Sequence, residues 1–503
     1  MRTDSVPDHL PSDAPDVPPG IRLGVVRGIT YGLVSPPETI VPQARSVGAE
    51  VVRIYLYWSQ IEPEPGTYDW SAVDAFLAQL DGDSADSPDS DGGVEAWVTV
   101  SSSSLWGTRR ATDMLPPSPA KDPAAFGAFV GRLVERCRGR VTYWQCDNEP
   151  SVPILWAGTA QEYVAQLRVF AAAVRAADPN ALVVLGGAPP GAVGSGREEG
   201  AVFEHIVANA RDDFDVFDVH LYGDPYGIPA AVEACRALMA SAGYQKPVVA
   251  GEYNGPVPFE FPQQAFAHLG PVVAASGGII GGGLPEDWTA QTSDQDKLPP
   301  EHEALSALYA RVGELPPELA MFVPGCPPEA EGRRHRWNCR DIVVRNMLAL
   351  ASGVRRTLCW NLGAELPDPG EGHGLMEFMF DKLKLMDYDE SGSGELRHRY
   401  PAADTLALTA RMLAGATDVR RHEVPDQPDV YVFEVDRPAG PVLVAWERRD
   451  GMSEEDKPAL AFDWPWPGSS ARAVDAYGAA VDTTVTEGRV RLALTITPVF
   501  VSG

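Results

Sequence analysis

The sequence contains few basic residues, and lysine is the scarcest of them. Lys and Arg together number 41 against 70 Asp and Glu, so the formal net charge is −29 at pH 7. Nucleic acids and anionic membrane surfaces are bound by concentrated positive charge. We therefore expect neither nucleic acid nor a membrane among the partners of this protein.

Long apolar runs are also missing. No stretch of 18 apolar residues occurs, so no segment is predicted to span a membrane. Residues 1–20 are polar, rich in proline and without the apolar core of a signal peptide. This composition predicts a disordered N-terminal tail and a cytoplasmic protein.

Cysteine and histidine are sparse as well. Of the six Cys, Cys326 and Cys339 lie in the same loop-rich stretch, which leaves a disulfide between them open. The other four fall in predicted helices or strands and are expected to be small core residues. The nine His are scattered, without the His-x-His or clustered spacing of metal-dependent hydrolases. We therefore expect no metal and no cofactor.

Short β-rich runs alternate with stretches of helical periodicity from residue 21 to about residue 415. Asp122-Pro123 marks one helix start, and Thr159 with Glu162 forms a candidate capping box at another. The predicted strands are 22–32, 50–58, 94–101, 141–149, 181–188, 215–223, 247–254 and 356–363. Eight strands with helices between them predict an α/β fold, a parallel (β/α)₈ TIM barrel over 21–415. A doubly wound open sheet is the alternative, but "GITYGLVSPP" after the first strand is not its glycine-rich phosphate loop.

Two regions depart from this alternation. Residues 255–340 are too long for one connection, and we expect this excursion over the C-terminal face of the barrel, where connections leave the strands. From residue 416 to 503 the runs have period two and no helices separate them. This pattern predicts a small antiparallel, sandwich-like β-domain.

Polar residues stand where the predicted barrel strands end, and catalytic groups of such barrels lie there. Asn148 and Glu149 end the fourth strand and Glu252 the seventh. A single carboxylate at a strand end is usually a solvated rim residue, but two carboxylates suggest glycoside hydrolysis. Further polar or aromatic residues come from the second, sixth and eighth strands: Arg53, His220, Tyr222 and Trp360.

These segments resemble the clan A retaining glycoside hydrolases. The matching stretches are "WQCDNEP" (144–150), "VVAGEYN" (248–254), residues 51–77, "HLY" (220–222) and Trp360. The five motifs stand in the order typical of that clan. The trailing β-domain is like those of several of its families, notably family 39, which the chain resembles most, and families 5 and 42 are also similar. Family 5 often has a His after the third strand. Here "VTVSSSSLWGT" has Ser101–Ser104 and Trp106 instead.

The resemblance implies a retaining β-glycoside hydrolase acting on a carbohydrate substrate. Glu149 would be the general acid/base, Glu252 the nucleophile, and Asn148 a hydrogen-bond partner of the sugar 2-hydroxyl. Asn148 and Glu149 are adjacent, so both reach one site only if the strand end bulges or twists. A non-catalytic carbohydrate-binding protein on a degenerate barrel is the alternative.

Three loop tryptophans are candidate platforms for sugar rings: Trp106, Trp156 and Trp288. Their apolar faces suit the C–H surface of a pyranose. Packing within the loops is the alternative for each.

Overall fold

The structure is a computed structural model. It describes residues 17–29, 31–33, 39–86, 93–194, 198–275, 300–363, 375–388 and 395–503. Most of the predicted N-terminal tail, residues 1–16, lies outside these ranges.

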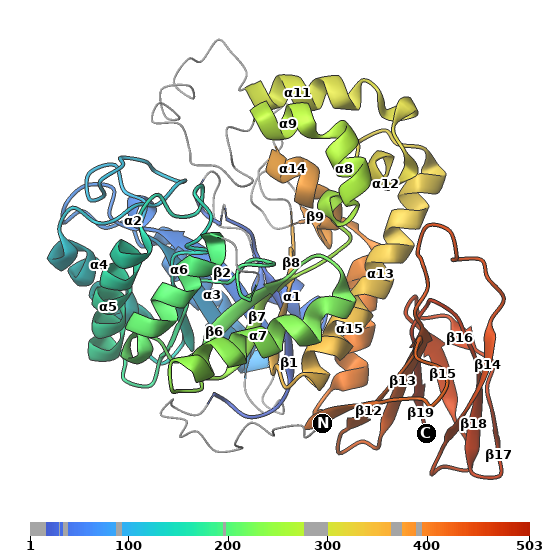
Figure 1. Cartoon of the computed structure of the whole chain (residues 1–503). Coiled ribbons are helices and arrows are strands. Elements are labelled where there is room, and N and C mark those ends of the chain that lie inside the picture. The colour runs from blue at the N-terminus through green and yellow to red at the C-terminus, as the bar shows by residue number, and fades with distance from the viewer. Residues whose placement is uncertain are drawn as a thin grey trace.

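Eight parallel strands form the barrel that the sequence predicted, and each lies within its predicted run (Figure 1). They are β1 (Arg22–Val26), β2 (Val51–Tyr57), β3 (Glu95–Ser101), β4 (Tyr143–Cys146), β5 (Leu182–Val184), β6 (Phe217–Leu221), β7 (Val248–Tyr253) and β8 (Arg356–Trp360). The strands pair in the order β5-β4-β3-β2-β1-β8-β7-β6. Parallel bridges Val184–Val216 and Ala188–Val219 join the two ends, so the barrel is nearly closed.

Helices surround the strands, and their ends follow the predicted caps. The larger ones are α1 (Val41–Ser46), α3 (Ser71–Asp86), α4 (Pro123–Cys137), α5 (Ala160–Ala177), α6 (Glu198–Asn209), α7 (Ile228–Ser241), α13 (Pro328–Ala351) and α15 (Pro401–Leu413). The Asp122 side chain accepts from the Ala124 N–H at the start of α4. Thr159 and Glu162 form the capping box of α5. Short elements are α2 (Trp58–Ile61), η1 (Arg211–Asp213) and η2 (Pro225–Gly227).

Strand parity separates two apolar cores. On β2, Ile54 and Leu56 pack outward against the helices, whereas Tyr55 and Tyr57 pack inside the barrel. This follows from the period of two along a strand. Arg53 shares the inward parity and is completely buried, so the barrel interior carries a charge that needs partners.

The described part of the excursion builds a helical cap with a core of its own. Its helices are α8 (Pro262–His268), α9 (Gly270–Ala275), α11 (Pro300–Tyr309) and α12 (Pro317–Ala320), after η3 (Pro258–Glu260) and with η4 (Val312–Glu314). Ile154, from the loop after β4, and Phe378, from α14 (Leu375–Phe380) after β8, pack into this core. The cap therefore stands beside loops that leave the C-terminal ends of strands (Figure 1).

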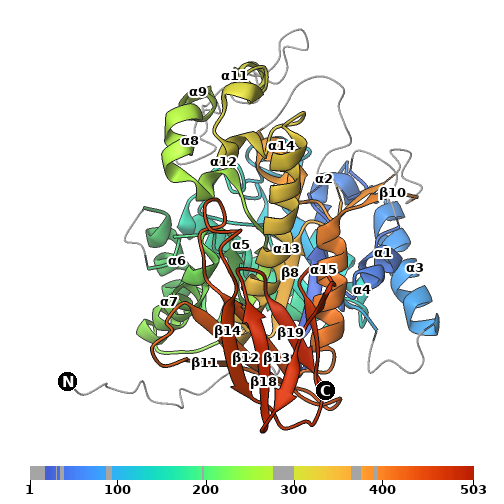
Figure 2. The same cartoon turned by 90° about the vertical axis from the view of Figure 1, so that its right-hand side faces the viewer.

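After α14, the chain forms η5 (Asp381–Leu383) and the hairpin β9 (Met386–Tyr388) and β10 (Leu396–Arg399) before α15. The C-terminal β-domain follows as two antiparallel sheets, shown in red-orange in Figure 2. One holds β11 (Asp418–His422), β12 (Val430–Asp436), β13 (Val442–Glu447), β15 (Arg472–Asp475), β16 (Ala480–Val481) and β19 (Val499–Ser502). The other holds β14 (Leu460–Pro465), β17 (Thr484–Thr486) and β18 (Arg489–Leu494).

The larger sheet of the β-domain is covered on both faces. On β12, Val430 and Val432 face the smaller sheet, whereas Tyr431 and Phe433 join the core shared with the barrel helices. Trp446 of β13 donates its indole N–H to the hydroxyl of Tyr226 in η2, at 3.0 Å. The sandwich is thus packed against the barrel and not merely tethered to it.

The disulfide left open by the sequence does not form, because Cys326 and Cys339 are both free thiols. Cys326 precedes α13 and donates to Glu331 at 3.3 Å, while Cys339 lies well inside that helix. A helix rises ~1.5 Å per residue, which separates the two by well over a disulfide's reach.

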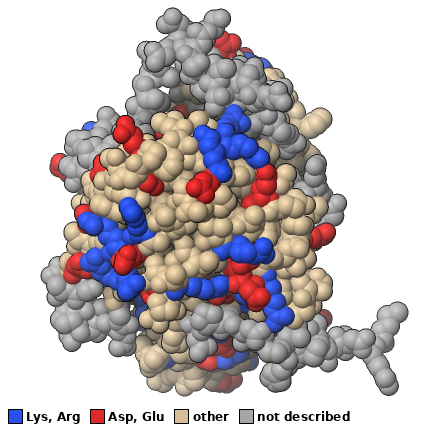
Figure 3. Space-filling view, turned by 90° about the vertical axis from the view of Figure 1, so that its left-hand side faces the viewer, with Lys and Arg blue, Asp and Glu red and all other residues tan. Residues whose placement is uncertain are grey.

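The surface mixes charges of both signs where Figure 3 shows it, on the face that carries α4 and α5. Ion pairs there include Arg109–Glu162 and Arg168–Asp213. Among the described helices, none combines the length and the apolar character needed to cross a bilayer.

Candidate active site

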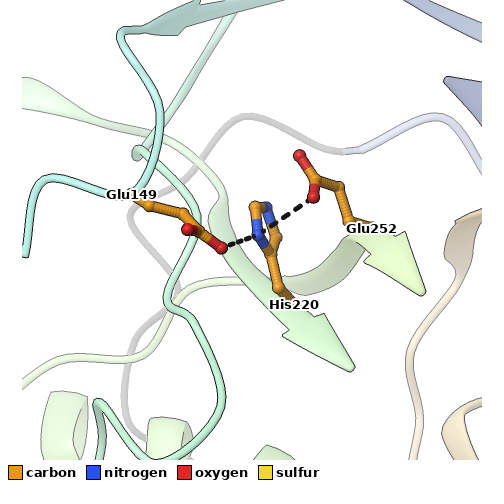
Figure 4. Close-up of side chains that lie close together, drawn as sticks. All are labelled: Glu149, His220 and Glu252. Atoms are coloured by element: carbon orange, nitrogen blue, oxygen red, sulfur yellow. Dashed lines mark hydrogen bonds and ion pairs between the residues drawn. The ribbon is translucent and has the colours of Figure 1, made fainter. Parts of the chain in front are cut away.

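Two carboxylates face one another at the C-terminal ends of β4 and β7, with an imidazole between them (Figure 4). They belong to Glu149 and Glu252, and the imidazole belongs to His220 at the end of β6. One ligand atom from each of the three side chains lies within 4.8 Å of the other two. The structure therefore brings together the two acids that the sequence singled out.

Glu252 is turned toward the site by a bulge in β7. Asp218 pairs with Val249 and His220 pairs with Glu252, so β7 has one residue more than β6 between these points. Gly251 lies in this bulge and donates its N–H to Asp218 at 2.5 Å. A Cβ at position 251 would lie 2.5 Å from Oδ1 of the same carboxylate, so only glycine fits there.

Arg53 holds Glu252 from below and uses all five of its N–H groups. Its Nη1 donates to the Glu252 carboxylate at 3.0 Å, and both side chains are almost completely buried. The other acceptors are the Gly251 carbonyl (3.0 Å), the Tyr55 hydroxyl (2.8 Å), Asn148 Oδ1 (2.9 Å) and the Thr99 hydroxyl (2.9 Å). A guanidinium with every donor in use has one orientation, so it fixes the carboxylate that it pairs with.

Two hydroxyl groups complete the surroundings of Glu252. The Tyr55 hydroxyl donates to Oε1 at 3.1 Å, and the Tyr222 hydroxyl donates to Oε2 at 3.0 Å. Burial raises the pKa of Glu252 above its ordinary value, and the cations His220 and Arg53 act against that rise. Arg53 and Tyr222, two of the residues singled out on the second and sixth strands, thus contact this carboxylate.

The end of β4 turns sharply enough to bring Asn148 and Glu149 to the same site. Asp147 and Glu149 both have left-handed backbone conformations, with φ of 51° and 39°. Such conformations cost a non-glycine residue roughly 1–3 kcal/mol and persist only where the surroundings enforce them. The twist that the adjacent pair required is therefore present, one residue on either side of Asn148.

The side chain of Asp147 holds this turn of the backbone in place from below the site. Its buried carboxylate accepts from the Ser102 N–H at 2.8 Å, from the Ser102 hydroxyl, and from Gln166 at 3.0 Å. Burial raises the pKa of Asp147 to about 6, although the bonds from Ser102 and Gln166 oppose this. Ser102 belongs to the serine run where family 5 often has a His, and here it anchors the strand that carries Glu149.

His220 is held between three carboxylates. Its Nδ1 lies 2.5 Å from Glu149 and 3.4 Å from Glu252, and its Nε2 lies 3.4 Å from Asp218. Burial lowers the pKa of the imidazole, but these three carboxylates outweigh it and raise the pKa to about 10. His220 is therefore an imidazolium at neutral pH. A Cβ at Gly187 would lie 2.5 Å from its Cε1, so the glycine leaves the space that the ring fills.

Aromatic rings wall the site on the side of β8. Trp360 lies edge-on to Tyr55, with ring centroids 6.3 Å apart, and to Phe380 of α14 at 6.1 Å. Phe380 also meets Tyr222 at 5.5 Å. Among the described residues, no hydrogen-bond partner exists for the buried indole N–H of Trp360.

Two of the three loop tryptophans, Trp106 and Trp156, pack against other residues and not into this site. The Trp156 ring is 2% exposed, packs edge-on against Tyr163 and donates to the Thr159 carbonyl. Trp106 packs against Trp58 and donates to the Glu62 carbonyl. The sugar-platform prediction is wrong for Trp156, because no ring face is open. Trp106 makes the packing contacts of its alternative, and Trp288 lies outside the described residues.

Sequence reasoning missed the polar layer beneath the two acids. Thr99 donates to Gln145 at 2.8 Å, and Gln145 donates to Asp218 at 2.8 Å, which links β3, β4 and β6 below Arg53. Tyr55 was also missed. Its signal was parity, because it follows Arg53 by two residues and so faces the same side.

Glu149, His220 and Glu252 also form the one group of potential metal ligands found among the described residues. Their donor set of two carboxylates and one imidazole suits zinc in principle. A metal would have to displace the proton that three carboxylates hold on His220.

Comparisons with known proteins place the fold. No protein-family model matches the sequence, and no curated protein matches it. A family 39 glycoside hydrolase from Bacteroides cellulosilyticus WH2 has a TM-score of 0.58 at 14% identity, over 96% of this chain and 81% of that one. A family 39 β-xylosidase from Caulobacter crescentus has a TM-score of 0.54 at 11% identity, over 98% of this chain and 97% of that one.

A third similar structure is AbfB, a family 51 α-L-arabinofuranosidase from Bifidobacterium longum. Its TM-score is 0.52 at 12% identity, over 97% of each chain. These likenesses confirm the predicted fold, a TIM barrel followed by an antiparallel β-domain. They cover the barrel and the β-domain together.

Proposed function

We propose that this protein is a retaining β-glycoside hydrolase. The observation that carries the proposal is the approach of the Glu149 and Glu252 carboxylates to within 4.8 Å across the mouth of the barrel. Retaining glycosidases place their two carboxyl groups ~5–5.5 Å apart, whereas inverting enzymes leave ~6.5–9.5 Å for a water molecule. The fold shared with family 39 enzymes supports the same reading.

The two carboxylates take different roles. Glu252 attacks the anomeric carbon, forming the C–O bond of a glycosyl-enzyme as the leaving-group oxygen departs with the proton of Glu149. Glu149 then removes a proton from water, which attacks the same carbon and releases Glu252. Asn148, whose side-chain oxygen accepts from Arg53, hydrogen-bonds the sugar 2-hydroxyl as charge develops at C1.

Azide rescue with an activated nitrophenyl β-glycoside tests both roles. In Glu252→Gly, azide enters the vacated space and attacks the substrate directly, so the expected product is the α-glycosyl azide. In Glu149→Ala, azide attacks the glycosyl-enzyme and the expected product is the β-glycosyl azide. Each product is identified by nuclear magnetic resonance of its anomeric proton.

The outcomes separate the competing functions. Full activity of both variants sinks the assignment of residues. Binding of oligosaccharides by calorimetry, without turnover of any nitrophenyl glycoside or polysaccharide in a panel, favours a non-catalytic carbohydrate-binding protein.

A metal-dependent hydrolase is the second candidate, because Glu149, His220 and Glu252 are within reach of one ion. The test is dialysis against a strong chelator followed by addition of Zn²⁺ or Mn²⁺. Activity that disappears and returns with the metal supports this candidate, whereas unchanged activity supports the two-carboxylate mechanism.

A further inference from the structure

The geometry points to Glu260 and Arg345 as positioning residues that hold Tyr222 against the carboxylate of Glu252. This inference rests on the proposed function, in which Glu252 is the nucleophile. It concerns two residues that contact none of Glu149, His220 and Glu252 directly, and that come from η3 and α13.

Tyr222 needs such support because the sheet does not supply it. β6 ends at Leu221, which is the last residue of that strand paired with β7. Gly223 follows with φ of 83°, so the chain turns away immediately after Tyr222. The hydroxyl that donates to Glu252 at 3.0 Å is therefore carried by a residue just beyond the strand.

Arg345 holds the peptide group before Tyr222, and Glu260 holds Arg345. Arg345 Nη1 donates to the Leu221 carbonyl at 2.9 Å, which fixes that peptide group. Arg345 Nη2 donates to the Glu260 carboxylate at 3.0 Å, so Glu260 sets the orientation of the guanidinium. Glu260 is itself fixed in η3, where it accepts from the Val257 N–H at 3.3 Å.

The anchor is buried and closely packed. Arg345 is completely buried, and its Nη2 also donates to Asp341 of the same helix at 2.9 Å. Burial raises the pKa of Glu260, and the guanidinium of Arg345 opposes that rise. A Cβ at Gly255 would lie 2.5 Å from the Asp341 carboxylate, so the chain leaving β7 passes directly over this cluster.

Stability alone is a weak explanation for this cluster. A buried ion pair often contributes little or nothing to folding relative to apolar residues of the same size, because desolvation offsets the attraction. What the pair supplies at this place is a fixed geometry for Tyr222. Its hydroxyl stabilises the ionised form of Glu252 and orients the oxygen that attacks the sugar.

A double-mutant cycle tests the inference on a nitrophenyl β-glycoside. Tyr222→Phe, Glu260→Ala and the double variant are compared with the wild type. We expect Glu260→Ala to lower kcat about tenfold, the loss of roughly one hydrogen bond in the transition state, with KM almost unchanged. The double variant should be no slower than Tyr222→Phe alone, because Glu260 acts through that hydroxyl.

The pH profile of kcat/KM gives an independent readout. Loss of the Tyr222 hydrogen bond removes a donor to ionised Glu252, so the acidic limb should move to higher pH in all three variants. Glu260→Gln keeps an oxygen that can accept from Arg345, and it should recover part of the kcat lost in Glu260→Ala. Melting temperatures are measured for every variant. If Glu260→Ala fails to fold, the double-mutant cycle is measured with Glu260→Gln and Tyr222→Phe instead.

Glu455→Ala is the matched control. Its carboxylate pairs with Arg336 at 2.8 Å and Arg340 at 2.5 Å, which are arginines of the same helix α13. It contacts the β-domain side of that helix and should leave kcat and the pH profile unchanged.

Additive losses in the cycle, or an unshifted acidic limb, overturn the positioning role. A Glu455→Ala variant that reproduces the kcat and the pH profile of Glu260→Ala also overturns it, because breaking any ion pair on α13 would then produce the same effect. The proposed function fails separately, through the absence of an α-glycosyl azide from Glu252→Gly. A rescued Glu252→Gly with an additive cycle rejects this inference alone.

Discussion

The two acids of the site differ sharply in how they are held. Glu252 accepts hydrogen bonds from Arg53, Tyr55 and Tyr222, and its side chain is 6% exposed. The Glu149 side chain is 14% exposed, and its one hydrogen bond among the described residues is the contact with His220. The carboxylate of Glu252, the locked side of the pair, is held by three donors, and that of Glu149, the free side, is held by one.

This difference matches the demands of the two roles. A nucleophile must present one oxygen to one carbon, so immobility lowers the entropic barrier. An acid/base alternates between donating and removing a proton and must meet both the leaving group and water, so it needs access. His220 links the two, because its imidazolium attracts both carboxylates.

The largest expected effect comes from removing each acid in turn and varying the leaving group. Glu252→Gln should lower kcat/KM on the order of 10⁶-fold with every substrate, as when a covalent nucleophile is lost. Glu149→Gln should cost about 10²–10⁴-fold with an alkyl glycoside, and much less with a dinitrophenyl glycoside whose leaving group needs no proton. Steady-state rates on both substrates provide the measurement.

Glu62→Gln is the matched control for this comparison. Glu62 is a buried carboxylate that accepts from Trp58 at 2.8 Å, outside the site. Loss of the Glu62 carboxylate should change kcat/KM only slightly, and by the same factor for both substrates. If the Glu149→Gln defect is the same for both leaving groups, Glu149 is not the proton donor.

A smaller effect is expected from a substitution at Gly251, which disturbs the position of the Glu252 carboxylate. Gly251→Ala pushes a methyl group against Asp218, which straightens the bulge that turns Glu252 inward. We expect kcat to fall about 10²-fold, the cost of a misplacement near 1 Å. Overpacking should also lower the free energy of unfolding by about 1–3 kcal/mol. Denaturant titration and kcat measure the two effects.

Gly131→Ala serves as the control because a Cβ there meets no atom within 4 Å on helix α4. It should leave kcat unchanged and stabilise the helix by roughly 0.5–1 kcal/mol. A Gly251→Ala variant with normal kcat would show that the bulge does not position Glu252.

The sequence predicted the locked side of the comparison better than the free side. Arg53 lies on the regular strand β2, where the period of two locates its side chain. Glu252 was located by the end of its strand, although the bulge at Gly251 sets its orientation. The orientation of Glu149 depends on left-handed conformations at Asp147 and Glu149, which no periodicity signals. Sequence could state that a twist was needed, but the Ser102 and Gln166 contacts that hold it come from segments distant in the chain.

The aromatic residues show a second limit of sequence reasoning. Trp360 ends a strand and lies where predicted, in the wall of the site. Trp156 follows β4 by a few residues in a loop, and nothing local distinguishes a ring that faces a ligand from one that packs inward. Phe380 joins the wall from α14, whose placement depends on the folded excursion.

The positive charge of His220, which attracts both carboxylates, should make the free energy of unfolding depend on pH. The pKa of His220 is raised to about 10, above its ordinary value of 6.5. The contribution of the imidazolium is therefore fully present below about pH 6.5 and is lost as the pH rises through about 10. The excess stability of the wild type over His220→Gln should shrink between pH 7 and pH 10. Urea titrations of both proteins at the two pH values measure it, and an unchanged difference contradicts the charged state.

The smallest effect on activity is expected at Trp156, which packs near the free side without facing the site. Trp156→Phe removes volume and the hydrogen bond to Thr159, so the free energy of unfolding should fall by about 1–3 kcal/mol. kcat and KM should each stay within about twofold of the wild type, because the ring does not face the site. A twofold change in kcat/KM corresponds to less than ~0.5 kcal/mol.

Trp360→Phe is the matched substitution in the site wall. It removes part of the ring that packs edge-on against Tyr55 and Phe380, so KM or kcat should change while the same volume is lost. A Trp156→Phe variant that alters KM as much as Trp360→Phe would place its ring on the path of the substrate. The substrate-binding surface beside Glu149 would then include the loop after β4. It would be larger than the binding surface beside Glu252.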